Sequence, residues 1–238
     1  MYENYRVSAI ITCAGKGVRF GGNKLLAPLD GMTVLEKTVR CFMLPTIDEV
    51  IVTVSADNEA EYRKILVDDA GLPVTLVLGA EERHLSAQKG LEGTTGDLIL
   101  VHDGVRPFVT PDLIDSVLEA AVEHGAAMLG LPSTVQVKLV SDVEFIEGSL
   151  DRAHSWLGQT PQVFRRDLLE RAYAGAIADK YHRVSDDADL VADYTGHSVK
   201  IIRGHENNIK ITTPMDIFVA AQIANLAPTA VEELITPS

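Results

Sequence analysis

The sequence predicts an α/β fold: a doubly wound, mostly parallel sheet with a protruding β-arm. Two observations carry this prediction. The strand-like segments are continuously apolar, which is typical of strands covered on both faces. Helix-period segments alternate with them, and β–α–β alternation produces parallel sheets. A chain of 238 residues, 46% hydrophobic, can bury a core that needs neither disulfides nor a structural metal.

The predicted strands are short apolar runs, and the predicted helices lie between and after them. The strands are Val7–Thr12, Val50–Val54, Val74–Leu78, Leu98–Val101, Ala126–Leu131 and Val199–Arg203. The helices are Thr33–Phe42, Glu59–Ala70, Pro111–Gly125, Arg166–Ala178, Asp186–Tyr194 and Thr213–Leu226. The third helix has the clearest start, because the hydroxyl of Thr110 can cap it, proline follows at its first position, and Gly125 ends it.

The segment after the fifth strand has a different pattern. From Thr134 to about Glu147, valines alternate irregularly with polar residues, and Ser141-Asp142 has the composition of a turn. This pattern predicts a β-hairpin within an arm of about residues 134–154, suited to contact a second subunit. We expect one domain over residues 1–228 and a loosely held tail over 229–238.

Composition and charge exclude several classes of function. The chain has 34 acidic and 21 basic residues and a net charge of −13, which repels nucleic acid and anionic membranes. Cys13 and Cys41 form no CxxC motif, so they suit a reducing compartment. The N-terminus has no signal-peptide pattern, and no apolar run reaches the length of a membrane span. We therefore expect a cytoplasmic protein that binds anionic ligands only at a local positive site.

The segment Thr12–Lys24 is the strongest candidate for such a site. It leaves the first strand and contains four glycines and three cations between Gly15 and Lys24. Glycines allow backbone N–H groups to point at a polyanion, and cations neutralise the remaining charge. A dinucleotide fingerprint would need glycine at Phe20, and a Walker A box would need Lys-Ser or Lys-Thr at Asn23-Lys24. The alternative is a flexible connection with solvated cations.

In the form Ala-Gly-x-Gly-x-Arg-x-Gly, this loop resembles the signature of sugar and alditol phosphate nucleotidyltransferases. Further blocks in the same order are Gly79–Arg83 with Ser86, Val101–Phe108, Gln159–Phe164, Ser185–Ala188 and Asn208–Asp216. Together they resemble the 2-C-methyl-D-erythritol 4-phosphate cytidylyltransferase family and its close relatives, the ribitol 5-phosphate cytidylyltransferases. The resemblance implies a Rossmann-like sheet of the nucleotidyltransferase type.

The resemblance also implies an activity. The phosphate of 2-C-methyl-D-erythritol 4-phosphate would attack the α-phosphorus of CTP, giving CDP-methylerythritol and pyrophosphate in the non-mevalonate route to isoprenoid precursors. One alternative is transfer to ribitol 5-phosphate, giving CDP-ribitol. An alternative of another class is a catalytically inactive regulator of the same fold that binds nucleotide.

The resemblance assigns a role to each matched residue. The catalytic cations are Arg19, Lys24 and Lys210, and Asp103 holds Mg²⁺. The nucleotide-binding residues are Ala14, Gly15, Gly17, Ala80, Glu81, Ser86 and Gly104. The residues that bind the alditol phosphate are Arg106, Arg152, Thr160, Ser185 and Lys210. Arg152 belongs to the arm and would reach the site of a second subunit, so a complete site requires a homodimer.

Simpler interpretations stand beside these roles. Arg19 and Lys24 can be surface cations, Asp103 can cap a turn, and Glu81 with Glu82 can be a solvated helix start. His102 has the pattern of a core histidine.

The sequence also departs from the family pattern. The Asp-Thr pair that contacts the alditol in the family is replaced here by Val135-Gln136. Ser185 stands where the family usually has threonine, and Asn23-Lys24-Leu25 replaces the usual Pro-Lys-Gln. These departures affect the acceptor more than the reaction.

Overall fold

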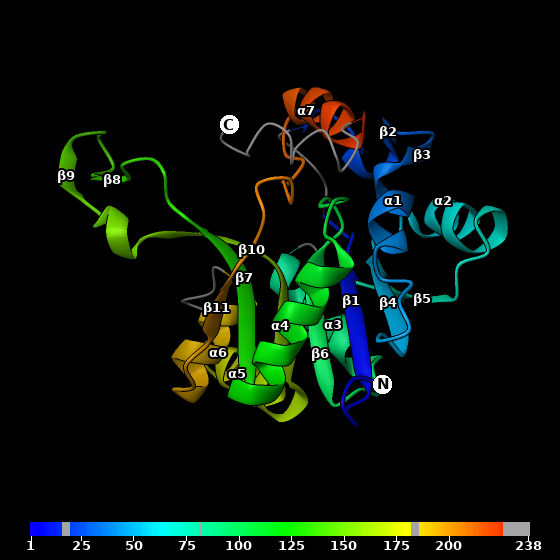
Figure 1. Ribbon diagram of the computed structural model, residues 1–238, viewed down its shortest axis with the longest axis horizontal. Helices are drawn as coiled ribbons and strands as arrows, with labels where there is room; N and C mark the ends of the chain where they lie inside the picture. The colour runs from blue at the N-terminus through cyan, green and yellow to red at the C-terminus, as the bar shows by residue number, and fades with distance from the viewer. Residues whose placement is uncertain (16–19, 81, 182–185, 226–238) are drawn as a thin grey trace, which may run out of the picture.

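The fold is built on a seven-stranded sheet in the order β11-β7-β10-β6-β1-β4-β5 (Figure 1). The computed structural model describes residues 1–15, 20–80, 82–181 and 186–225. β10 runs antiparallel to both of its neighbours, and the other strands are parallel to one another. The strands are β1 (Val7–Thr12), β4 (Glu49–Val54), β5 (Val74–Leu78), β6 (Leu98–Asp103), β7 (Ala126–Pro132), β10 (Trp156–Arg165) and β11 (Lys200–Arg203).

Helices cover both faces of the sheet, as continuously apolar strands predict. One face packs against α1 (Val34–Arg40), α2 (Glu59–Arg63), α4 (Pro111–His124) and α7 (Pro214–Asn225). The other face packs against α3 (Arg83–Glu92), α5 (Arg166–Ala178) and α6 (Asp187–Thr195). Strand alternation divides the core accordingly: Ile11 lies in the first cluster and Ile10 in the second. The predicted doubly wound α/β architecture is confirmed.

The predicted ends of α4 are confirmed in atomic detail. The Thr110 hydroxyl accepts a hydrogen bond from the N–H of Leu113, and Pro111 occupies the first helical position. Gly125 ends the helix with a φ of 83°, in the left-handed region that glycine tolerates.

Four features differ from the predicted elements, and the first is α3, which is absent from the predicted helices. The predicted helix Glu59–Ala70 is α2 followed by a π-helical segment, Lys64–Asp69. The two short strands β2 (Pro28–Leu29) and β3 (Met32–Thr33) were not predicted. Nor was β10, because Pro161 and its polar neighbours interrupt the apolar pattern. The register of β10 shifts between Gln159 and Gln162, which is where a strand accommodates proline.

The arm is a separate hairpin, as predicted. β8 (Lys138–Val140) pairs antiparallel with β9 (Ile146–Ser149), and the turn begins at Ser141, whose N–H donates to the carbonyl of Phe145 at 2.9 Å. Figure 1 shows the hairpin standing away from the sheet and its helices. The predicted C-terminal tail, residues 229–238, lies outside the described residues.

Within the described ranges, no helix has the length and apolar character needed to cross a membrane.

The position of α3 over the sheet depends on Gly90. A Cβ at this buried residue would lie 2.5 Å from Cγ2 of Ile10 and 3.1 Å from Cγ2 of Thr53. We therefore predict that Gly90→Val lowers stability by about 2–3 kcal/mol through overpacking. Thermal denaturation should then occur about 4–10 °C below the wild type.

The matched control is Gly148→Val on β9. There the nearest atom to an added Cβ is Cδ1 of Leu139 at 3.6 Å, an ordinary contact. The control should unfold within about 2 °C of the wild type, since valine suits an exposed strand. An unchanged melting temperature for Gly90→Val would contradict the close contact between helix and sheet.

Candidate functional site

The candidate site lies at the carboxyl ends of β1 and β6, where the strand order reverses direction along the chain. Ligands of open α/β sheets bind at such a switch point. Thr12 at the end of β1 is paired in register with Asp103 at the end of β6. The N–H of Gly104 donates to the carbonyl of Thr12 at 3.1 Å. A Cβ at Gly104 would lie 2.9 Å from that same carbonyl oxygen, so glycine allows the two strand ends to approach.

The carboxylate of Asp103 is the centre of the site. Arg83 Nε donates to Oδ1 at 2.8 Å, while Arg106 Nε and Lys210 Nζ lie 3.2 and 3.0 Å from Oδ2. Burial alone raises the pKa of Asp103, but the charges of Arg83, Lys210 and Arg106 lower it well below its usual value. Positive charge is therefore concentrated here in a chain whose net charge is −13.

Arg106 connects this carboxylate to the segment that carries Lys210. Its side chain is only 9% exposed, and its Nη1 donates to the carbonyl of Asn208 at 2.9 Å. The side-chain amide of Asn208 donates to the carbonyl of Thr160 at 2.9 Å, and Gln159 Nε2 donates to the carbonyl of His205 at 3.0 Å. The segment 205–210 is therefore fastened to β10 and to the end of β6. Lys210 itself is 39% exposed and can reach a ligand.

Hydrogen bonds next to the Asp103 carboxylate determine which ring nitrogen of His102 carries the proton. His102 Nε2 lies 3.1 Å from the carbonyl of Arg106 and must donate to it. Its Nδ1 therefore accepts from the Thr160 hydroxyl at 3.0 Å, and that hydroxyl accepts from the N–H of Asp103 at 3.1 Å. Burial lowers the pKa of His102 to about 3, which keeps the ring neutral. The prediction that His102 is a core histidine is confirmed.

The predicted base-reading segment folds around Ser86. The Ser86 hydroxyl accepts from the N–H of Ala80 at 3.0 Å and donates to the carbonyl of Ala80 at 2.8 Å. These bonds bring Ala80 onto the first turn of α3. Glu82 precedes α3 and is exposed, as the solvated interpretation expected, while Glu81 lies outside the described residues.

Only part of the glycine-rich loop belongs to the described residues. Ala14 is buried directly after β1, and Gly15 is exposed. Gly17 and Arg19 lie outside the described ranges.

Lys24 begins a 3-10 turn and lies near the start of α7. Burial raises the pKa of Asp216, but the N–H groups of Thr213 and Thr212, and then the charge of Lys24, lower it below its usual value. Since Thr212 follows Lys210 closely in the chain, the two predicted catalytic lysines lie on neighbouring segments.

The predicted alditol residues are divided among three places. Thr160 and Arg106 are buried in the Asp103 network with protein partners. Arg152 begins an exposed 3-10 turn of the arm, which Figure 1 shows extending away from the sheet. Ser185 lies outside the described residues, and the predicted helix Asp186–Tyr194 is α6, which begins at Asp187 with Asp186 as its N-cap.

Two carboxylates beside Ser185 have structural partners. Asp186 accepts from Gln162 Nε2 and from the N–H of Asp189, each at 2.9 Å. Asp187 is fully buried and accepts from Arg83 Nη1 and the Tyr173 hydroxyl, each at 2.6 Å. Both carboxylates are therefore engaged in hydrogen bonds and an ion pair that hold the start of α6 in place.

Sequence reasoning assigned no role to Arg83, Gln159 or Asn208, all of which shape the site. One signal could have identified Arg83. A cation on the first turn of a helix is repelled by the helix dipole, so it indicates that acidic side chains lie nearby. The amides of Gln159 and Asn208 gave no comparable signal.

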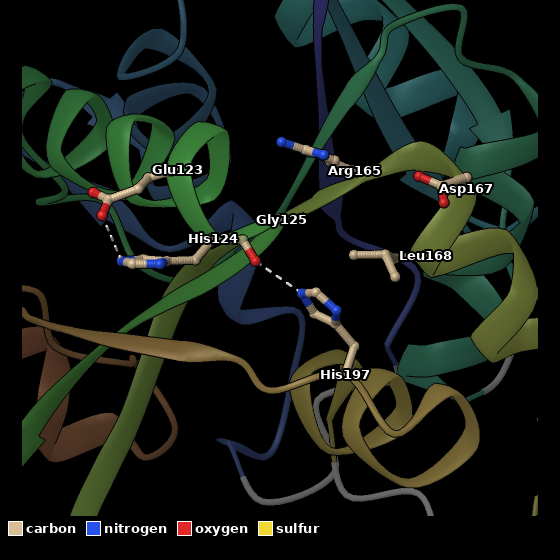
Figure 2. A pocket seen from close by; sticks show the side chains of 7 residues that line it. All are labelled: Glu123, His124, Gly125, Arg165, Asp167, Leu168 and His197. Atoms are coloured by element: carbon tan, nitrogen blue, oxygen red, sulfur yellow. Dashed lines mark hydrogen bonds and ion pairs between the residues drawn. The ribbon is translucent and has the colours of Figure 1, made fainter.

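A hollow of about 320 Å³ lies at the other end of the sheet (Figure 2). In it, His197 Nε2 donates to the carbonyl of His124 at 2.8 Å, which satisfies the end of α4. Glu123, Arg165 and Asp167 give it mixed charge. This hollow lies at the opposite end of β6 from Asp103, since Arg165 in its lining pairs with Leu98.

This chain is similar to known proteins over most of its length. The family model described as 2-C-methyl-D-erythritol 4-phosphate cytidylyltransferase matches residues 7–225. The protein of that name from Pelotomaculum thermopropionicum is 38% identical over 225 residues, covering 92% of this chain and 94% of the relative. The one from Syntrophotalea carbinolica is 39% identical over 225 residues, with 90% and 94% coverage.

Solved structures give the same result. The 4-diphosphocytidyl-2C-methyl-D-erythritol synthase of Anaerococcus prevotii superposes with a TM-score of 0.83 at 30% identity, covering 94% of this chain and 98% of that chain. The 2-C-methyl-D-erythritol 4-phosphate cytidylyltransferase of Thermus thermophilus has a TM-score of 0.76 at 32% identity, with 93% and 100% coverage. The fold and the family predicted from the motifs are both confirmed: the chain belongs to the 2-C-methyl-D-erythritol 4-phosphate cytidylyltransferase family.

Proposed function

We propose that this protein transfers the cytidylyl group of CTP to 2-C-methyl-D-erythritol 4-phosphate. A phosphate oxygen of the acceptor forms a bond to the α-phosphorus, and pyrophosphate leaves with the electrons of the broken bond. Both reactants are anions, so catalysis requires alignment and neutralisation of charge rather than a covalent intermediate. The observation that carries the proposal is the convergence of Arg83, Arg106 and Lys210 on Asp103 at the switch point.

The cations have different tasks in this reaction. Lys210 and Lys24 are partly exposed, and we assign them, with Arg19, to the phosphates of CTP. Arg106 is buried and holds the Lys210 segment, and contact of Arg106 or Thr160 with the alditol stays a prediction. Ala14, Gly15, Gly17 and Gly104 would supply backbone contacts to the nucleotide, and Ala80, Glu81 and Ser86 would read cytosine.

A divalent cation fits this donor set only together with the nucleotide. In the part of the chain that the structure describes, no three His, Cys, Asp or Glu side chains cluster as a metal site. Asp103 offers a single carboxylate, and Mg²⁺ in such sites uses one or two carboxylates together with substrate phosphates. We assign Asp103 as its protein ligand, and the ion would take the place of one of the cations now paired with this carboxylate. The ion would supply neutralisation of phosphate charge.

An assay of pyrophosphate release tests the proposed function. We expect release from CTP and Mg²⁺ with 2-C-methyl-D-erythritol 4-phosphate, and at least tenfold less with ribitol 5-phosphate or with UTP in place of CTP. Turnover with ribitol 5-phosphate alone would establish the CDP-ribitol alternative. Binding of CTP without turnover on either acceptor would establish the inactive regulator.

The same assay tests the two lysines. We predict that Lys24→Ala and Lys210→Ala each lower kcat about 100-fold or more, because each removes a charged donor from the transferring phosphates. Far-UV circular dichroism should stay unchanged. Lys64→Ala is the control, since Lys64 pairs with Asp69 on an exposed surface, and its activity should stay within twofold of the wild type. Near-normal kcat in either lysine variant would reject its catalytic role.

The arm supports a homodimer, with a second copy of this chain covering its apolar side chains. Val143, Phe145 and Ile146 are 72%, 73% and 68% exposed on the hairpin. Exposed apolar side chains gathered on one element mark an interface. Arg152 follows the hairpin and would enter the partner's site, as the family resemblance implies.

We predict that the wild type sediments as a dimer and that Phe145→Asp/Ile146→Asp sediments as a monomer with reduced activity. Buried aspartates at an interface are costly, so the double substitution should separate the subunits. Ile177→Asp on α5 is the control, because Ile177 is 51% exposed but distant in the fold from the arm. Analytical ultracentrifugation gives the measurement, and a monomeric wild type would refute the arm-mediated dimer.

A further inference from the structure

Arg83 joins two carboxylates from distant parts of the chain. Its Nε donates to Asp103 Oδ1 at 2.8 Å, and its Nη1 donates to Asp187 Oδ2 at 2.6 Å. Asp103 ends β6 and Asp187 begins α6, so they are 84 residues apart in the sequence. One planar guanidinium therefore connects the end of the central sheet to the start of a helix.

Each carboxylate belongs to a different half of the proposed site. Asp103 is the assigned metal ligand beside the nucleotide loop. Asp187 lies two residues after Ser185, which the family resemblance places at the alditol phosphate. Arg83 itself stands on the first turn of α3, three residues from both Ala80 and Ser86 of the predicted base reader. Arg83 therefore connects the predicted base reader, on which it stands, to the end of β6 and to the start of α6.

The first turn of α3 is an unfavourable position for the positive charge of Arg83 when the helix is considered alone. The positive end of the helix dipole repels a cation there, and α3 has no side-chain cap. The ion pairs with Asp103 and Asp187 offset this repulsion. Asp187 is fully buried, and its other oxygen already accepts from the Tyr173 hydroxyl at 2.6 Å. Without Arg83, the charge of Asp187 would be buried without a cation among the partners that the structure describes.

Arg83 also has donor capacity left over. Its Nη2 is buried and has no hydrogen-bond partner among the described residues. A buried N–H group without a partner is uncommon in folded proteins. The two ion pairs therefore leave the Nη2 group of Arg83 able to donate a further hydrogen bond.

We propose that Arg83 is a positioning residue that couples the nucleotide half of the site to the acceptor half. This inference rests on the proposed function, since it names the two halves by their substrates. The guanidinium holds Oδ1 of Asp103, while Lys210 and Arg106 lie beside Oδ2. It also sets the position of the α6 start relative to that carboxylate. Lysine cannot replace it, because a point charge lacks the fixed fork that spans two carboxylates.

The closing experiment compares Arg83→Lys with a matched control, Arg166→Lys. The Arg166 side chain has the same 26% exposure, donates to the carbonyl of Gly96 and to the Thr94 hydroxyl, and lies at the opposite end of β6. Calorimetry would measure the affinity for 2-C-methyl-D-erythritol 4-phosphate with and without the non-reactive analogue α,β-methylene CTP and Mg²⁺. Pyrophosphate release would give kcat and KM for each variant.

In the wild type and in Arg166→Lys, we expect the CTP analogue to raise acceptor affinity at least fivefold. In Arg83→Lys, we expect that enhancement to disappear and kcat to fall at least 100-fold, with cooperative unfolding retained. Equal kcat losses in the two lysine variants, or an unchanged enhancement in Arg83→Lys, would overturn the inference. So would a wild type that turns over without any such enhancement.

A second variant keeps the test decisive if Arg83→Lys fails to fold. Asp187→Asn keeps the size of the side chain and can still accept from Tyr173, but it removes the charge that Arg83 bridges. It should raise KM for the acceptor at least fivefold while changing the affinity for the CTP analogue less than twofold, and an unchanged KM would overturn the coupling. A wild type that releases no pyrophosphate with either acceptor would instead refute the proposed function. The two failures are therefore distinguishable.

Discussion

The buried carboxylate of Asp103 and the cations around it organise this molecule. An isolated buried charge costs several kcal/mol, and it is tolerated only when charged partners and hydrogen bonds satisfy it. Here the partners are Arg83 from the start of α3, Arg106 from the turn after β6, and Lys210 from the segment before α7. Neutralising one carboxylate therefore requires three separate segments to meet at the switch point of the sheet.

Much of this arrangement could be predicted from the sequence, because local rules govern it. The apolar runs predicted the parallel strands. The ends of α4 were predicted from Thr110, Pro111 and Gly125. The position of Asp103 at a strand end also followed from the apolar run that precedes it. Lys210 could be placed in the site only through the family resemblance, since nothing in its own neighbourhood points to residue 103.

The remaining features depend on contacts between distant residues. β10 was missed because its pattern is interrupted where Thr160 and Gln159 turn to polar partners in the site. The role of Asn208 could not be predicted either, since its side-chain amide donates a hydrogen bond to the carbonyl of Thr160, 48 residues away. Such residues break the apolar pattern because their surroundings supply hydrogen bonds, and a sequence pattern does not record those surroundings.

The order of these segments along the chain has a consequence for biosynthesis. Asp103, Arg83 and Arg106 all emerge from the ribosome about a hundred residues before Lys210 and Asn208. Domains begin to fold while translation continues, so a nascent chain can assemble β1, β4, β5 and β6 while Asp103 still lacks its third cation. The group of cations around Asp103 is therefore complete only after Lys210 has been synthesised.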